Sequence, residues 1–392
     1  MADSYDVAIV GGGINGAGVA QAAAAAGHRV LLLEQSALAH GTSSRSSKLI
    51  HGGLRYLETA QVALVRESLH ERTVLLRLAP ELVRLVPFHI PIYRSTRRRP
   101  WQVRAGLALY ALLGGCRTEN RFSSLPRKEW DRLDGIDTCE LQAVFRYYDG
   151  QTDDAALTRA VARSAQSLGA ELVLPGRFEG AALEAEGCSV DFLDGDRTRT
   201  CRARVLVNAA GPWVNRVAER ITPAPPRQDI DLVRGTHIVV RGGLEHGIYY
   251  LESPGDGRAV FAMPRSGQTL VGTTEAIYDG DPQLVSPPDS EREYLCGILK
   301  HYFPGWRATP PDVISAYAGL RVLPRGAGRA FDRPRETIYA ADRLDRPRVL
   351  SIYGGKLTTF RTTAQKVMQR IAPSLPSRNP VSGTDQLRLS PG

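Results

Sequence analysis

The stretch SSKLIHGGLRYLE, residues 46–58, places side chains that hold anions or exchange protons around two adjacent glycines. Glycine lets the backbone pass where a Cβ would collide, so this loop can lie against a ligand. Arg55 needs an anionic partner if it is buried. His51 can accept a proton near neutral pH or be a structural histidine, and Tyr56 can contact a ligand or simply pack. These residue types predict an anion-binding or proton-transferring loop, provided that other elements position it.

A nucleotide-binding pattern precedes this loop, in YDVAIVGGGINGAGVAQAAAAAGHRVLLLE. It predicts a strand at 5–10, an alanine-rich helix that ends at Gly27, and a second strand at 29–33. Glycines at G-x-G-x-x-G spacing between the first strand and the helix allow a tight turn, backbone approach to a pyrophosphate and close helix packing. Glu34, after the second strand, stands where a carboxylate accepts hydrogen bonds from an adenosine ribose. We therefore expect a dinucleotide-binding unit, and the spacing alone leaves FAD and NAD open.

Several runs resemble the FAD-dependent glycerol-3-phosphate dehydrogenases, respiratory flavoproteins with the fold of the amino-acid oxidase and glycine oxidase superfamily. The runs are TSSRSSKLIHGGLRYLE (42–58), VNAAGPW (207–213), GTHIVV (235–240), GLRVLP (319–324) and GGKLTTF (354–360). The resemblance covers nearly all of residues 4–375. It implies FAD as cofactor and an α/β fold, in which a discontinuous Rossmann-like FAD-binding domain joins an α+β substrate domain built on an antiparallel sheet.

The resemblance and the local patterns together divide the chain. We expect the FAD-binding domain at 1–90, 150–220 and 325–373, and the substrate domain at 91–149 and 221–324. Residues 230–275 alternate apolar and polar between turn signals, which is typical of an antiparallel sheet. We expect a strand and loop near the adenine end at 170–178, and a buried strand at 205–208. The polar, proline-bearing tail 374–392 is predicted to be disordered.

The resemblance also implies a loop that crosses under the flavin ring and a set of cofactor contacts. The expected cofactor-binding residues are Gly11, Gly13, Ile14, Asn15, Gly16, Glu34, Thr42, Ser43, Ser44, Ser47, Lys48, Leu49, His51, Gly52, Ala210, Gly211, Gly355, Lys356, Leu357 and Thr358. Thr358 and Thr359 are expected to cap a following helix, whose amides would face the flavin.

The implied reaction oxidises sn-glycerol 3-phosphate to dihydroxyacetone phosphate and passes the electrons to a quinone. Hydride transfer from a secondary alcohol needs a base for the hydroxyl proton. His237 is the first candidate and His51 the second, and either can instead be a histidine that merely bonds to backbone. The planar guanidinium of arginine can donate two hydrogen bonds at once to a substrate phosphate. The implied substrate-binding residues are Arg55, Tyr56, Arg321, Arg335 and Lys356, of which Arg321 and Lys356 are placed nearest the reacting carbon.

Two other functions stay open. The chain can be a flavoenzyme for another amine, amino acid or 2-hydroxy acid, or a shortened FAD-binding protein without turnover. A carboxylate substrate needs one arginine, whereas a phosphate justifies several, so the number of cations favours the phosphate.

The sequence departs from the family in two places. The family reads Gly-Val-Arg-Pro-Leu where this chain has Gly319-Leu320-Arg321-Val322-Leu323, with the proline displaced to Pro324, so the turn beside Arg321 can differ. Family members also continue beyond a linker into a helical carboxy-terminal domain. This chain stops at LRLSPG, where that linker begins, so we expect the domain to be absent.

Composition bounds the location and the partners. The chain has 392 residues and a net charge of +9, and of its 50 basic residues only five are lysine. It has no transmembrane-length apolar run, no secretory signal and no Cys pair typical of a metal site, which predicts a cytoplasmic protein with reduced thiols. No nucleic-acid motif accompanies the charge. The run RSTRRRPWQVRAGLALYALLGG (94–115) suits an interfacial helix on anionic lipid, and the alternative is a substrate-domain helix with a solvated basic edge. We expect the former, with peripheral binding to the inner face of the cytoplasmic membrane. A homodimer is a further expectation.

Overall fold

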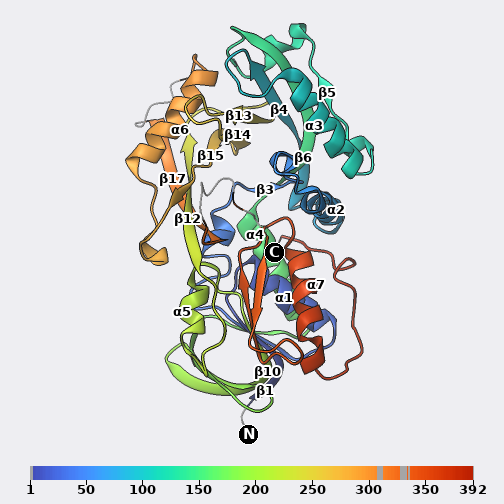
Figure 1. Ribbon diagram of the computed structural model, residues 1–392, viewed down its shortest axis with the longest axis vertical. Coiled ribbons are helices and arrows are strands. Elements are labelled where there is room, and N and C mark those ends of the chain that lie inside the picture. Colours follow the sequence, from blue (N-terminus) through green and yellow to red (C-terminus); the bar gives the residue numbers. More distant parts are fainter. Residues whose placement is uncertain (1–2, 307–311, 327–332, 334–335, 392) are drawn as a thin grey trace.

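The computed structural model describes residues 3–306, 312–326, 333 and 336–391. Two sheets follow one another along the long axis of the molecule (Figure 1). The sheet nearer the amino terminus contains β1 (Asp3–Val10), β2 (Val30–Leu33), β7 (Glu171–Val173), β8 (Gly176–Leu183), β9 (Cys188–Asp194), β10 (Arg197–Asn208), β11 (Ile221–Thr222), β18 (Ile338–Ala341) and β19 (Val349–Tyr353). Its strand order is β11-β8-β9-β10-β1-β2-β7, with β19 beside β10 and β18 beside β19.

The centre of this first sheet is parallel and buried. Strands β10, β1, β2 and β7 are parallel to one another, and β19 is parallel to β10. Strand β10 alternates exposed and buried residues where it pairs antiparallel with β9, and its last four residues, between β1 and β19, are all buried. The sequences of parallel strands that are covered on both faces are continuous apolar runs. The strands expected at 5–10, 29–33 and 205–208 are therefore confirmed within longer or slightly shifted elements.

Helices cover the first sheet. They are α1 (Ile14–Ala25), α4 (Asp154–Ser167), α5 (Val214–Ala218) and α7 (Phe360–Ile371). Helix α1 packs against both α4 and α7, and nearly all of its residues are buried. Its alanines and glycines permit this close packing, since a Cβ at Gly18 would lie 2.8 Å from the Phe360 ring.

The second sheet is built mainly from antiparallel strands. It contains β3 (Leu49–Ile50), β4 (Val83–Tyr93), β5 (Ser123–Ser124), β6 (Leu141–Thr152), β12 (Ile230–Val240), β13 (Ile248–Glu252), β14 (Ala259–Arg265), β15 (Gln268–Gly272), β16 (Ala276–Ile277) and β17 (Val313–Pro324). Its order is β16-β12-β15-β14-β13-β4-β6-β3, with β17 beside β12 and β5 beside β6. The antiparallel pattern expected at 230–275 is confirmed.

Helices also cover the second sheet. Helix α6 (Asp289–Tyr302) contributes to one hydrophobic cluster with it, and α2 (Val62–Leu78) and α3 (Pro100–Leu113) contribute to another. Strands β12 and β17 pair along their lengths, and their ends nearest the first sheet pack against β18 and β19. The two sheets are thereby joined by a continuous pair of strands.

The strands run past the domain limits that the sequence suggested. Strand β4 belongs to the second sheet from Val83 onward, and β6 extends to Thr152 because the two strands pair from Val83↔Thr152 to Tyr93↔Leu141. Residues 49–50, 83–90 and 150–152, which we expected in the FAD-binding domain, therefore lie in the second sheet. No change of composition in the sequence marks the ends of β4 and β6.

The prediction of a disordered tail is wrong for the part that the structure describes. The Val381 N–H donates to Ala25 O at 2.7 Å, and the Leu389 N–H donates to Leu78 O at 2.8 Å. The Leu389 side chain is only 4% exposed. A buried leucine, backbone hydrogen bonds and polar contacts such as the ion pair of Arg378 with Asp6 hold a segment whose average composition is polar.

Candidate active site

The turn between β1 and α1 has the geometry that its glycines predict. A Cβ at Gly16 would lie 1.9 Å from Gly11 O, so strand and helix are too close for any side chain there. Gly11, Gly13, Ile14 and Asn15 line a cavity of about 810 Å³. The positive end of α1 thus faces a space where an anion is stabilised.

Glu34 lies at one end of this cavity. Its carboxylate accepts hydrogen bonds from Gly12 N–H at 2.8 Å and Ser36 N–H at 2.9 Å. Gly176 and Phe178, after β7, line the same region, and the Gly176 N–H donates to Glu34 O at 2.7 Å. The carboxylate is therefore fixed where the sequence predicts ribose recognition.

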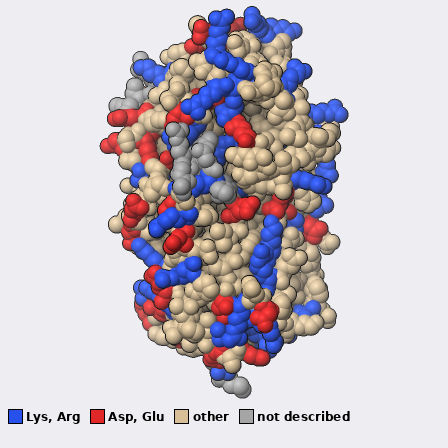
Figure 2. All heavy atoms as spheres, in the orientation of Figure 1, with Lys and Arg blue, Asp and Glu red and all other residues tan. Residues whose placement is uncertain are grey.

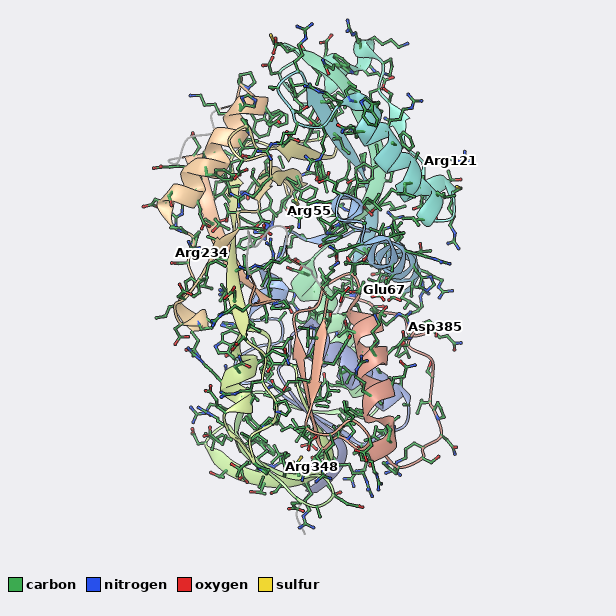
Figure 3. All side chains as sticks on the ribbon, in the orientation of Figure 1. Arg55, Glu67, Arg121, Arg234, Arg348 and Asp385 are labelled. Carbon is green, nitrogen blue, oxygen red and sulfur yellow. The ribbon has the colours of Figure 1, made fainter. Side chains whose placement is uncertain are left out.

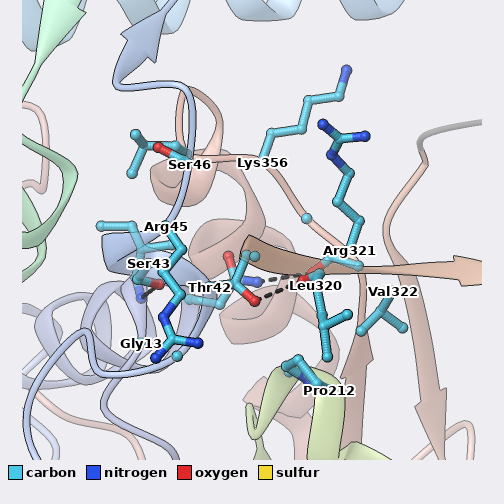
Figure 4. A pocket seen from close by; sticks show the side chains of 18 of the residues that line it. Gly13, Thr42, Ser43, Arg45, Ser46, Pro212, Leu320, Arg321, Val322 and Lys356 are labelled. Carbon is cyan, nitrogen blue, oxygen red and sulfur yellow. Dashed lines mark hydrogen bonds between the residues drawn. The ribbon is translucent and has the colours of Figure 1, made fainter. Parts of the chain in front are cut away.

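Two side chains attach the loop after β2 to the rest of the cavity wall. Ser43 Oγ accepts a hydrogen bond from Ile14 N–H at 2.9 Å, and Thr42 Oγ1 donates to Leu320 O at 2.7 Å. Figure 4 shows both bonds from close by. The loop thus joins the start of α1 to strand β17.

The turn that precedes α7 forms the facing wall. Asn15 Nδ2 donates to Gly354 O at 3.0 Å, and Gly355 packs against Asn15 so closely that a Cβ would lie 2.6 Å from its amide. Thr359 occupies the N-cap position of α7 without a side-chain capping bond. Thr358 Oγ1 instead accepts from His51 N–H at 3.2 Å. The expectation that these threonines cap the helix is therefore wrong, and Thr358 holds the loop that contains His51.

Cationic side chains gather at the end of the cavity opposite Glu34. Lys356 and Arg321 extend to the same side of it (Figure 4), and Arg55 lies in the middle of the molecule between the two sheets (Figure 3). Lys356 Nζ lies 3.9 Å from the centre of the Tyr56 ring, and the Arg55 guanidinium carbon lies 5.6 Å from it. This end of the cavity therefore has these three cations, two of which lie over the Tyr56 ring.

The two candidate histidines both lie in the cavity wall. Burial, with Arg321 nearby, lowers the pKa of His237 to about 3, and its Nε2 lies 2.9 Å from Ser47 Oγ. Its ring also stacks on Tyr317, with centroids 4.9 Å apart. Burial lowers the pKa of His51 to about 4; Asp149 opposes this shift, whereas Lys356 and Arg55 add to it. Both imidazoles are therefore neutral at pH 7.

Most of the predicted cofactor and substrate residues line this one cavity, but four do not: Gly16, Ser44, Lys48 and Gly52. Gly16 serves helix packing. Lys48 Nζ pairs with the fully buried Asp154 carboxylate and donates to Ser44 O at 2.6 Å. Ser44 Oγ donates to Gly41 O at 3.3 Å, and Gly52 packs against Tyr110. Arg335 lies outside the described residues.

Sequence reasoning missed several charged residues of the cavity, among them Glu275 and Arg45. Glu275 pairs with Arg321, and its side chain is only 7% exposed. Arg45 also lines the cavity, and Figure 4 shows its guanidinium on the side of Gly13. Arg45 stands inside the TSSRSSK run, so its position in the motif was a signal. Glu275 follows a strand with no such mark.

The residues present fit FAD. The glycine turn at the start of α1 leaves room for the diphosphate, and the Glu34 carboxylate stands where the ribose would lie. The cavity then extends to Lys356, which gives room for the ring system. Among the described residues, no three His, Cys, Asp or Glu side chains gather as a metal site. No helix in the described ranges is long and apolar enough to span a bilayer.

Comparison with known proteins gives relatives along the whole chain. The FAD dependent oxidoreductase (DAO) family model matches residues 6–361. D-erythritol 1-phosphate dehydrogenase from Brucella abortus is 37% identical over 374 residues, which cover 94% of this chain and 74% of that protein. Glycerol-3-phosphate dehydrogenase from Pseudomonas aeruginosa is 38% identical over 391 residues, with 97% and 74% covered. The aerobic glycerol-3-phosphate dehydrogenase of Escherichia coli is 36% identical, with 95% and 74% covered.

Solved structures agree with these relatives. Glycerol-3-phosphate dehydrogenase from Bacillus halodurans, complexed with FAD, has a TM-score of 0.78 at 28% identity, covering 98% of this chain and 68% of that one. Glycine oxidase from Geobacillus kaustophilus has a TM-score of 0.72 at 20% identity, covering 97% and 98%, which shows a shared fold alone. The chain is similar to these proteins over nearly its full length.

Proposed function

The chain belongs to the family of FAD-dependent oxidoreductases, and from this premise we propose that it oxidises sn-glycerol 3-phosphate to dihydroxyacetone phosphate. The observation that carries the substrate is the group Arg55, Arg321 and Lys356 at one end of the cavity. A phosphate monoester carries between one and two negative charges near neutral pH. Arg321 also pairs with Glu275, so this end of the cavity combines these three cations with a carboxylate.

Arg335 is the fourth cation that the resemblance assigns to the phosphate. It lies outside the described residues, so its role stays a prediction. We assign Arg55 and Arg335 to the phosphate, and Lys356 and Arg321 to the region of the reacting carbon. Cations there also stabilise the negative charge of a reduced flavin.

FAD, when bound, accepts the hydride that leaves C2 of the substrate, and a protein base takes the hydroxyl proton. We propose His51 as this base ahead of His237, the reverse of the order that the sequence suggested. His237 is 2% exposed and its Nε2 is engaged with Ser47. His51 is less buried and lies beside the cation pair Arg55 and Lys356. Those cations would also stabilise the developing alkoxide.

A second candidate substrate is a longer polyol phosphate. The relative from Brucella abortus, named for D-erythritol 1-phosphate, is about as similar to this chain as the glycerol-3-phosphate dehydrogenases are. Both substrates present a phosphate and a secondary alcohol, so the same cations serve either. An amine or 2-hydroxy acid substrate carries less negative charge than a phosphate monoester and would use fewer of these cations.

We also propose a quinone as electron acceptor and peripheral attachment to anionic lipid through α3. The inward face of α3 carries Val103, Leu107 and Tyr110, whereas Trp101 and Leu112 are 70% and 64% exposed on its outer side. Arginines accompany this face; Arg121, just beyond the helix, points outward in Figure 3. Lys and Arg side chains also lie at the top and along the right edge of the face in Figure 2. The expected homodimer stays a prediction.

The test is an absorbance spectrum of the FAD-loaded protein under anaerobic conditions. Glycerol 3-phosphate should bleach the flavin bands, whereas glycerol and amino acids should not. Faster bleaching by erythritol 1-phosphate would select the second candidate. A flavin that stays oxidised with both phosphates would overturn the proposal and favour a non-catalytic FAD-binding protein.

A further inference from the structure

A buried polar cluster lies outside the cavity, behind the loop that contains His51. Its members are Arg72 on α2, Tyr110 on α3 and Asp149 on β6, which are 0%, 1% and 1% exposed. Arg72 pairs with one oxygen of Asp149, and Tyr110 Oη lies 2.6 Å from the other. A buried charge pair with all these bonds made is costly to disturb.

The cluster ends on the backbone of the loop. The Gly52 N–H donates to Tyr110 Oη at 2.8 Å. Burial and the Asp149 carboxylate raise the pKa of Tyr110 well above its ordinary value, so the phenol keeps its proton. Tyr110 Oη therefore donates to Asp149 and accepts from Gly52, and the direction of each bond is fixed.

The contact is also steric. A Cβ at Gly52 would lie 2.4 Å from Tyr110 Oη and 2.5 Å from Leu69 Cδ2. On the other side, Thr358 Oγ1 accepts from His51 N–H. The backbone at 51–52 is thus held between the turn before α7 and the Tyr110 hydroxyl, with His51 and Arg55 facing the cavity.

We propose that Tyr110 is a positioning residue, whose hydroxyl fixes the backbone at Gly52 and thereby places His51 and Arg55 for the reaction. The proposal rests on the proposed function for its kinetic consequence only. The restraint on the loop is a property of the chain itself. Tyr110 does not line the cavity, so it contributes to no cofactor contact.

The experiment compares the FAD-loaded Tyr110→Phe variant with wild type. Tyr302→Phe is the matched control, because Tyr302 is 2% exposed and its hydroxyl donates to Glu252 O at 2.6 Å, in the core of the second sheet. Hydrogen exchange is measured for the peptide 49–57, and flavin reduction by glycerol 3-phosphate is measured anaerobically.

Tyr110→Phe should retain FAD, exchange the Gly52 amide at least tenfold faster and reduce flavin at least tenfold more slowly at saturating substrate. Tyr302→Phe should leave the exchange of 49–57 and the reduction rate unchanged. Wild-type exchange in Tyr110→Phe, or an equal loss of rate in both variants, would overturn the proposal. If glycerol 3-phosphate fails to reduce the wild type, the proposed function fails, and the exchange of the Gly52 amide still decides whether Tyr110 restrains the loop.

Discussion

Two lysines of this chain show how little a residue type says without its neighbours. Lys48 and Lys356 both stand in the runs that resemble a flavoenzyme. Lys48 is paired with the buried Asp154, whereas Lys356 lies over the Tyr56 ring in the cavity. The same ammonium group forms a buried ion pair in one place and lines the cavity in the other, where we propose that it contacts the substrate.

Exchanging each lysine for methionine should separate these roles. Lys48→Met leaves the Asp154 carboxylate buried and unpaired, so the free energy of unfolding should fall by about 3–5 kcal/mol. Lys356→Met should slow flavin reduction by glycerol 3-phosphate at least about tenfold, from the loss of a charge-assisted contact. Urea unfolding and anaerobic reduction measure the two effects. A wild-type reduction rate in Lys356→Met would contradict the site assignment.

Arg45 allows a prediction for the cofactor alone. Its guanidinium lies in the cavity on the side of Gly13, where a diphosphate would sit at the end of α1. Arg45→Ala should raise the dissociation constant for FAD by roughly 10- to 100-fold, since hydrogen bonds to charged groups contribute about 1.5–3 kcal/mol. Quenching of flavin fluorescence on binding measures this constant without turnover. The exposed Arg104→Ala serves as control, and equal affinities in both variants would remove Arg45 from the site.

Buried histidines make stability depend on pH. Burial and Arg146 lower the pKa of His89 to about 4. The unfolded chain takes up a proton as the pH falls below about 6.5, whereas the folded chain does not until about pH 4. His89 therefore causes no loss of the free energy of unfolding above pH 6.5. Between pH 6.5 and 4 this free energy declines by about 1.4 kcal/mol per pH unit. His89→Gln should flatten the fall in unfolding free energy between pH 6.5 and 4, whereas the exposed His301→Gln should not.

At the scale of elements, the sequence predicted what local patterns determine. The apolar runs of β1, β2 and β10, the glycine turn and the alternation across 230–275 all specify their own conformation. The ends of β4 and β6 depend on pairing between distant segments, so no local signal marks them. The same holds for Glu275, whose place in the cavity is set by the pairing that brings β17 and Arg321 beside it.

The tail is the segment whose composition gave the wrong prediction, since its polar residues predicted disorder. Leu389 packs in a hydrophobic cluster that also contains Ile14 and Leu75. Leu389→Ala should lower the free energy of unfolding by about 2 kcal/mol or more, the lower range for a buried leucine. Val381→Ala, at a side chain that is 64% exposed, should change it little. Equal unfolding midpoints in urea for both variants would show that the packed tail contributes nothing to stability.

At the scale of the whole molecule, the outer side of α3 allows a test of membrane attachment. The double variant Trp101→Glu and Leu112→Glu should bind vesicles of anionic phospholipid at least about tenfold more weakly, because it removes apolar area and adds negative charge. Its flavin reduction should match wild type. Leu344→Glu, at a side chain that is 99% exposed on another part of the surface, is the control. Unchanged vesicle sedimentation in the double variant would rule out α3 as the attachment.

The pair β12–β17 has a mechanical consequence for the molecule. Its ladder runs from Ile230↔Pro324 to Val240↔Val313 with a register shift between Val239 and Val240, and its end nearest the first sheet packs against β18 and β19. Swinging one half of the molecule away from the other would separate the buried apolar side chains of Val322, Ala340 and Tyr353, at about 25 cal/mol per Å² of apolar surface exposed. We therefore expect the two halves to move as one stiff body that does not open and close. Turnover in such a body does not wait for closure of the halves, so thickening the solvent with sucrose should leave the rate of flavin reduction nearly unchanged.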